Sequence, residues 1–291
     1  MKRRQFVAAG LALSALPAWA APERFARGLL WRVTKKGIAT GHVYGTIHVP
    51  DPRLAELPPP VRSAFDGARS LMVEFLPDAY TKERFAEAAM FQDRQTLEQT
   101  IGAEDFERAL RELRPLGLSR EFVNKLKPWG VLLNLRAAQA APEPALDAQL
   151  LDLARARRVP LHPMEGVEEQ IFTFDELAMA SQVALLRHSL AHREEILALA
   201  QRTVDAYLAR DLAAIWRLRE SYVALHPEIA EHQAALTKRV VLDRSVVMAF
   251  RMQRQLRLGG SFVALGALHL YGEQGVLALL DADGYRATRI Y

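Results

Sequence analysis

Two short segments share a pattern that could bring two histidines to one site. Residues 43–48 (Val-Tyr-Gly-Thr-Ile-His) and 264–269 (Ala-Leu-Gly-Ala-Leu-His) each run from an apolar stretch into Gly-x-x-His. A glycine at a strand end lets the backbone turn without a clash at Cβ. The histidine that follows then lies at the rim of a sheet, where α/β folds build their sites. We therefore expect His48 and His269 to meet; the alternative is two unrelated histidines at strand ends.

Glu74 is the acid that best completes such a site, because it stands between Val73 and Phe75 in an apolar segment. A buried carboxylate must be paired, coordinated or protonated, since an isolated buried charge is costly. Two imidazoles and one carboxylate would make a three-ligand metal site with a position open for water. A divalent ion turns that water into a nucleophile near neutral pH. The alternative for Glu74 is a salt bridge with an arginine.

Two further residues are candidates for the same site. Glu165 ends an apolar run and precedes Gly166, so it either projects toward the sheet rim or caps the helix expected from about residue 167. Arg244 precedes the last expected core strand and could bind a substrate carbonyl or an anionic intermediate. The alternative for Arg244 is an ion pair with Asp243 or another nearby acid.

The composition limits which catalytic groups and metal ligands the chain can supply. The chain has no cysteine, which excludes disulfides, thiolate metal sites and a thiol nucleophile. Histidine and carboxylate ligands favour zinc, manganese, cobalt or iron. His188 and His192 have helical i, i+4 spacing, but Ser189 stands where a zincin motif needs glutamate. We expect these two histidines, together with His226 and His232, to be surface or packing residues.

The elements that position these residues lie at both ends of the chain. Apolar and β-branched runs predict strands over residues 29–34, 42–45, 71–75, 262–266 and 285–291. Helical periodicity dominates the middle, at about 81–257. The fold class we expect is α/β or α+β, with a central mixed sheet built from both ends and a large helical middle region. Residues 21–291 would then form a single domain with a helical insertion.

Residues 1–20 have the pattern of a cleavable signal peptide. Lys2, Arg3 and Arg4 precede a short apolar run that ends in Ala-Trp-Ala. We expect a periplasmic or secreted protein, with Arg3-Arg4 a weak indication of twin-arginine export. The formal charge of +4 falls to +1 without those three basic residues, the only charged ones in the segment. The sequence thus predicts no nucleic-acid partner and no stable membrane span.

Six ordered segments together resemble the TraB/GumN family, which is related to the Tiki metalloproteases and more distantly to erythromycin esterase-like and ChaN-like proteins. The resemblance spans nearly all of the chain after residue 20. The segments are residues 44–49, 71–75, 127–129, 146–150, 164–170 and 266–275.

This resemblance implies a metal-dependent hydrolase site made of two Gly-x-x-His motifs and a glutamate. The motifs match Gly45 with His48 and Gly266 with His269, and the glutamate matches Glu74. Glu165 matches a glutamate that precedes a Glu-Gln pair in many relatives. Arg244 matches the arginine of an Arg-Asn pair, but Ser245 follows it here, which puts the role of the asparagine in doubt.

The function we expect is that of an exported, metal-dependent hydrolase, most simply a peptidase acting on a peptide or small-molecule substrate. His48, Glu74 and His269 would bind Mn²⁺, Co²⁺ or Zn²⁺, and Glu165 or Glu74 would act as the general base. Two alternatives stay open. One is a metal-independent hydrolase that uses a histidine and a glutamate, and the other is a non-catalytic protein that binds haem or metal.

Overall fold

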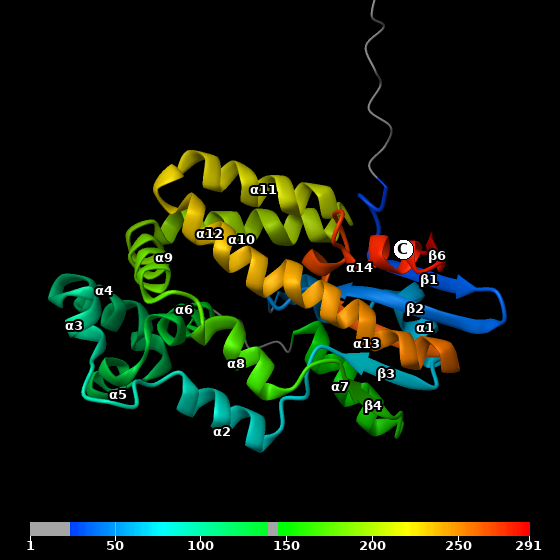
Figure 1. Cartoon of the computed structure of the whole chain (residues 1–291), viewed down its shortest axis with the longest axis horizontal. Helices are drawn as coiled ribbons and strands as arrows, with labels where there is room; N and C mark the ends of the chain where they lie inside the picture. Colours follow the sequence, from blue (N-terminus) through cyan, green and yellow to red (C-terminus); the bar gives the residue numbers. More distant parts are fainter. Residues whose placement is uncertain (1–23, 50, 139–144) are drawn as a thin grey trace, which may run out of the picture.

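The computed structural model describes residues 24–49, 51–138 and 145–291, and it confirms the predicted α/β class (Figure 1). The predicted signal peptide lies outside the described residues. Among those residues, none of the helices combines the length and the apolar character that crossing a membrane requires. The assignment of residues 21–291 to one domain remains a prediction from the sequence.

A six-stranded mixed sheet forms one side of the molecule, with the strand order β4-β3-β5-β2-β1-β6. β5 is parallel to β2 and to β3, while β1 is antiparallel to β2 and β6. The C-terminal strand β5 therefore lies between two N-terminal strands, as the sequence predicts. The strands are β1 Leu30–Lys35, β2 Ile38–Thr46, β3 Ser70–Val73, β4 Leu161–Pro163, β5 Ser261–Gly266 and β6 Arg286–Arg289.

Helices cover both faces of this sheet. Phe65 of α1 packs edge-on against Phe262 of β5, and Leu256 of α13 approaches Gly41 of β2. Phe262 of β5 pairs with His42 of β2, so these two side chains point to the same face of the sheet. Gly41 precedes His42 in β2 and faces the other side, because consecutive strand residues face opposite sides. α1 and α13 thus lie on opposite faces, which explains why β5 is buried along its length. The helices whose apolar residues share this core are α1 Pro59–Asp66, α7 Leu146–Ala156, α10 Arg193–Leu208, α11 Leu212–Leu225, α13 Arg244–Leu258 and α14 Val276–Ala282.

Most of the remaining helices extend away from the sheet and enclose a second apolar core (Figure 1). Trp129 is buried there, stacked on Phe174 and edge-on to Phe85. The side chains of Lys127 and Trp129 both donate to Asp175. The helices of this second core are α2 Ala79–Ala88, α3 Leu97–Ile101, α4 Ala103–Leu113, α5 Arg120–Lys125, α6 Pro128–Ala137, α8 Val167–Asp175 and α9 Met179–Ala191, while α12 Ala230–Thr237 packs through Leu236 against a small third cluster.

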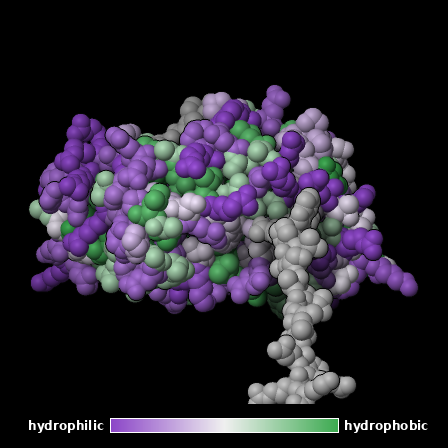
Figure 2. Space-filling model, turned by 90° about the horizontal axis from the view of Figure 1, so that it is seen from above, coloured by the Kyte–Doolittle hydropathy of each residue, from purple (hydrophilic) through white to green (hydrophobic). Residues whose placement is uncertain are grey.

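One detail differs from the sequence-based expectation. β3 ends at Val73, so Glu74 follows the strand instead of lying within it. The sequence also predicts a short strand-like run over residues 159–164 that leads to Glu165, and this run forms β4, which pairs with β3 at the edge of the sheet. Glu74 and Glu165 thus lie just beyond the ends of two neighbouring strands. Figure 2 shows that hydrophilic residues predominate on the face seen from above in Figure 1, with hydrophobic ones in small separate patches.

Tyr207 connects the helical region to the end of β2. Its hydroxyl, on α10, donates to the Gly45 carbonyl at 2.8 Å and lies 3.0 Å from the Tyr44 hydroxyl. Both tyrosines are buried, with 2% and 1% of their surface exposed. The Tyr207 hydroxyl is therefore the hydrogen-bond partner of two buried polar groups, the Gly45 carbonyl and the Tyr44 hydroxyl, which lie three and four residues before His48 in the chain.

We predict that Tyr207→Phe destabilises the protein by about 1–3 kcal/mol, because it leaves a buried carbonyl and a buried hydroxyl without their partner. Urea unfolding followed by circular dichroism measures this change. The control is Tyr80→Phe, since Tyr80 is 61% exposed and should be nearly neutral. Equal stability of the two variants would contradict the prediction.

Candidate functional site

The two Gly-x-x-His motifs meet at the carboxyl ends of adjacent parallel strands. Thr46 of β2 pairs with Gly266 of β5, and each histidine follows within three residues. A Cβ placed on Gly266 would lie 3.3 Å from Glu74 Oε1, 3.5 Å from His269 Cδ2 and 3.6 Å from His48 Nε2. The structure therefore brings the three predicted ligands together around one glycine.

The glycines of the two motifs have different tasks. A Cβ on Gly45 would lie 2.6 Å from Leu270 Cδ1 and 3.1 Å from Ala267 Cα, so a side chain there would push away the turn that carries His269. Gly266 instead leaves open the space between the two imidazoles and the carboxylate. One glycine allows the turn to pack, and the other keeps the centre of the site free.

His48 is held in place through its Nδ1. This nitrogen lies 2.9 Å from Asp147 Oδ2 in an ion pair, and Asp147 Oδ1 accepts a hydrogen bond from the Thr46 hydroxyl at 2.7 Å. Nε2 then faces Glu74 Oε1 at 3.6 Å. Desolvation lowers the pKa of His48, but Asp147 and Glu74 outweigh it and hold that pKa well above 6.5. The side chain remains 58% exposed, so solvent or a substrate can reach it.

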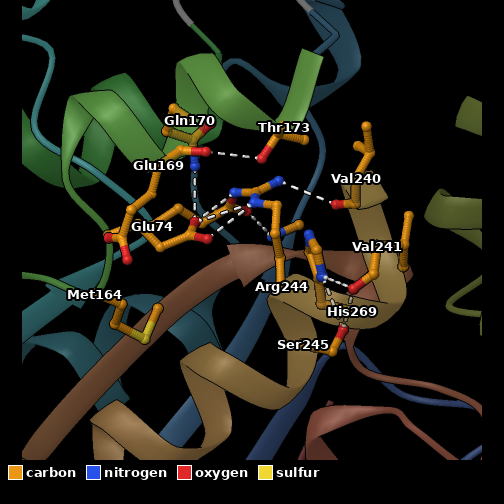
Figure 3. Close-up of polar contacts among 12 residues, drawn as sticks. Glu74, Met164, Glu169, Gln170, Thr173, Val240, Val241, Arg244, Ser245 and His269 are labelled. Atoms are coloured by element: carbon orange, nitrogen blue, oxygen red, sulfur yellow. Dashed lines mark hydrogen bonds and ion pairs between the residues drawn. The ribbon is translucent and has the colours of Figure 1, made fainter. Parts of the chain in front are cut away.

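His269 is also anchored through Nδ1, but in a buried environment. Its Nδ1–H lies 2.9 Å from Ser245 Oγ and 3.2 Å from the Val241 carbonyl (Figure 3). Burial lowers the pKa of His269 to about 4, so the ring is neutral at neutral pH. With the proton on Nδ1, Nε2 carries the lone pair. Val241 belongs to a π-helix, Lys238–Asp243, that leads directly into α13.

Arg244 joins two buried carboxylates. Its guanidinium donates to Glu74 Oε2 and, at 2.7 Å, to Glu165 Oε2 (Figure 3). Glu74 also accepts the Gly266 N–H at 2.6 Å, and Glu165 accepts from Gln170 at 2.7 Å. Only 7% of Glu74 and 6% of Glu165 are exposed. One cation is therefore shared between two acids that lie almost out of contact with water.

The protein shifts the pKa values of Glu74 and Glu165 in opposite directions. Burial raises the pKa of Glu74, but the nearby His48 and Arg244 outweigh it and hold that pKa well below its usual value. Burial also raises the pKa of Glu165, and there Arg244 does not fully compensate. Paired carboxylates whose pKa values are pushed apart are typical of sites that need one fixed anion and one proton carrier.

The structure gives the side-chain partners of Glu165 and Arg244. Glu169, not Glu165, accepts the Gly166 N–H at the start of α8, at 2.9 Å. Asp243 pairs with Lys238 at 2.6 Å, and Arg244 is free to bind the two glutamates. The salt-bridge alternative for Glu74 is also present, since Glu74 pairs with Arg244 while it faces His48.

Two residues of the site were missed by the sequence analysis. Asp147 is not among the predicted site residues, yet it lies in the first turn of α7 and its side chain pairs with His48. Ser245 was noted as a departure from the family pattern, yet its hydroxyl donates to Val241 at 2.7 Å and contacts His269. The signal for Asp147 was its place in one of the six segments that resemble the family.

Comparison with known proteins assigns the sequence to a family. The sequence profile of the TraB/PrgY/gumN family matches residues 29–289, a range that includes every residue of the site. The chain belongs to the TraB/PrgY/gumN family. Its curated relatives include the uncharacterized protein YbaP of Shigella flexneri and that of Escherichia coli K12. Each is 27% identical over 255 residues, which cover 85% of this chain and 90% of the relative. No solved structure matches.

The buried ring of His269 predicts a pH-dependent stability of this TraB/PrgY/gumN protein in metal-free buffer. An unfolded histidine takes up a proton near pH 6.5, whereas folded His269 resists protonation until about pH 4. The unfolded state therefore binds more protons in that window, and stability falls as the pH falls through it. We expect His269→Gln to lack this contribution, which is worth up to about 3 kcal/mol.

Urea unfolding of wild type and His269→Gln at several pH values between 7 and 4 measures the effect. The difference in unfolding free energy between the two proteins should shrink as the pH falls. A difference that stays constant across this range would show that His269 is not held neutral by burial.

Proposed function

We propose that this protein is a metal-dependent hydrolase that is exported and cleaves peptides. The observation that carries the proposal is that both imidazoles are anchored at Nδ1, to Asp147 and to the Val241 carbonyl, beside one ionised glutamate. Metal-binding histidines characteristically use one ring nitrogen for the metal and give the other to a carboxylate or carbonyl. Export rests on the signal-peptide pattern of residues 1–20.

The chemical types of the proposed donors suit a divalent metal ion. His48 Nε2 and Glu74 Oε1 are 3.6 Å apart, close to the roughly 3.3 Å between neighbouring ligand atoms of a tetrahedral zinc site. His269, neutral and with its lone pair on Nε2, would be the third ligand. Two imidazoles and a carboxylate suit zinc, manganese or cobalt. The absent side chain of Gly266 leaves room at the centre.

The chain's own residues would complete the chemistry around the ion. A bound divalent ion supplies Lewis acidity, which lowers the pKa of water and polarises a carbonyl group. Glu165, with its raised pKa, is the residue we assign to accept and return a proton. Arg244 presents a buried cation that stabilises negative charge on the substrate. Asp147 keeps His48 in the orientation that ligation needs.

Metal analysis tests the site directly. We predict that His48→Ala and Gly266→Ala each retain about one equivalent less metal per chain than wild type, because the first removes a ligand and the second fills the centre. Gly67→Ala is the matched control, since the nearest atoms to its Cβ are 3.8 Å away. Elemental analysis of the purified proteins gives the counts, and hydrolysis of a peptide library follows activity. Metal content equal to that of wild type in both variants would overturn the proposal.

Replacing Glu165 tests whether its carboxyl group accepts and returns the proton during hydrolysis. We predict that Glu165→Gln keeps its metal but loses about 100- to 10,000-fold in kcat, the usual contribution of a general acid–base group. Glu169→Gln is the control, because Glu169 caps α8 and pairs with Arg251 outside the proposed ligand set. Full activity of Glu165→Gln would assign the proton transfer to another residue.

A second candidate function has one observation in its favour. Both oxygens of Glu74 already accept hydrogen bonds from the protein, Oε1 from Gly266 N–H and Oε2 from Arg244. His48, oriented by Asp147, would then activate water with a glutamate and without a metal, in ester hydrolysis. Activity that survives exhaustive chelation in the same assay would favour this mechanism over the metal-dependent one.

A further inference from the structure

Three histidines and a glutamate outside the proposed active site form a compact cluster among the helices. His188 lies in α9, His192 at the junction of α9 and α10, His226 at the end of α11, and Glu228 in the short turn Pro227–Ile229. One potential ligand atom from each of the four lies within 4.8 Å of all the others. α9 lies far from the strands of the sheet (Figure 1).

The distances within this cluster approach those of a coordination site. His188 Nδ1 and His226 Nδ1 lie 3.2 Å and 3.6 Å from the same oxygen, Glu228 Oε1. Neighbouring ligand atoms around a tetrahedral zinc ion, with bonds of about 2.0–2.1 Å, are roughly 3.3 Å apart. The cluster therefore needs only small side-chain movements to enclose an ion.

The other nitrogen of each ring has a partner of its own. His188 Nε2 lies 2.8 Å from the Tyr222 hydroxyl, and His226 Nε2 lies 3.0 Å from Glu195 Oε2. The second oxygen of Glu195 is 2.9 Å from His192 Nδ1. His188 and His226 are thus left with Nδ1, and His192 with Nε2, for a common ligand. Such outer hydrogen bonds fix ligand orientation in metal sites.

A cluster that only packs gives a weaker account of these contacts. The ring centroids of His188, His192 and His226 are 4.4–4.8 Å apart, so protonated rings would repel one another. Burial and the two neighbouring rings lower the pKa of His188, which keeps it available as a neutral donor. The Nδ1 atoms of His188 and His226 both lie close to one carboxylate oxygen of Glu228, and a cation bound among these three atoms would interact favourably with all of them.

We propose that His188, His192, His226 and Glu228 bind a zinc ion at a second site, separate from the proposed active site. Four protein ligands close the coordination sphere, which is typical of a structural zinc site. The ion would join the junction of α9 and α10 to the end of α11, so its binding stabilises the helical region. The proposal does not depend on metal at the other site, since the two sites share no residue.

The test uses His48→Ala as the background, because it removes a proposed ligand of the first site. After metal stripping, we expect this protein to bind about one Zn²⁺ per chain by calorimetry and to melt at a higher temperature with zinc. Adding Glu195→Gln, which alters only the outer contacts, should weaken zinc binding about 10- to 100-fold. Adding His192→Ala or Glu228→Gln removes a ligand and should abolish binding.

Two features allow this experiment to separate loss of zinc binding from loss of the fold. The side chains of His192 and Glu228 are 33% and 58% exposed, so their replacement should spare the fold. His232→Ala is the matched control, a histidine of the same region that contacts Ser181 and lies outside the cluster. Absence of zinc binding in the His48→Ala protein would overturn the proposal. Zinc binding that is unchanged in both ligand variants would also overturn it.

Discussion

The ion pairs of Arg244 with Glu74 and Glu165 are the constraint on which the rest of the site depends. Each partner follows the end of a different strand, β3 and β4, while Arg244 begins α13. Two buried carboxylates without this cation would have to take up protons or draw in water, because isolated buried charges are costly. The guanidinium therefore aligns strand ends from distant parts of the chain, and the Gly266 N–H adds the end of β5 to the same network.

Much of this arrangement could be predicted from the sequence because it depends on local patterns. Apolar runs predicted the strands, and glycine before histidine predicted turns at their ends. The meeting of His48 with His269 followed from one further rule, that ligands of an α/β sheet gather where parallel strands end. Glu74 could be proposed because a carboxylate among apolar residues needs a partner, although the predicted end of β3 was two residues too late.

The parts that could not be predicted depend on which side chains meet across the fold. Asp147 looks like an ordinary acid in the first turn of a helix, and only the packing of α7 beside the end of β2 gives it His48 as a partner. Ser245 stands where the family resemblance implies an asparagine, yet its hydroxyl contacts His269 and donates to the Val241 carbonyl of the preceding π-helix. His188 and His192 were expected to be surface or packing residues because Ser189 breaks a zincin motif, and their closeness to His226 appears only in the folded structure.

The central position of β5 also limits when the protein can become functional. Until residues near 261–266 leave the ribosome, β2 and β3 have no strand between them, and their edges stay open to pairing with other chains. Contacts between such distant segments form slowly. Neither half of the molecule can therefore assemble the candidate site by itself, and the site is completed only when synthesis of the polypeptide is nearly finished.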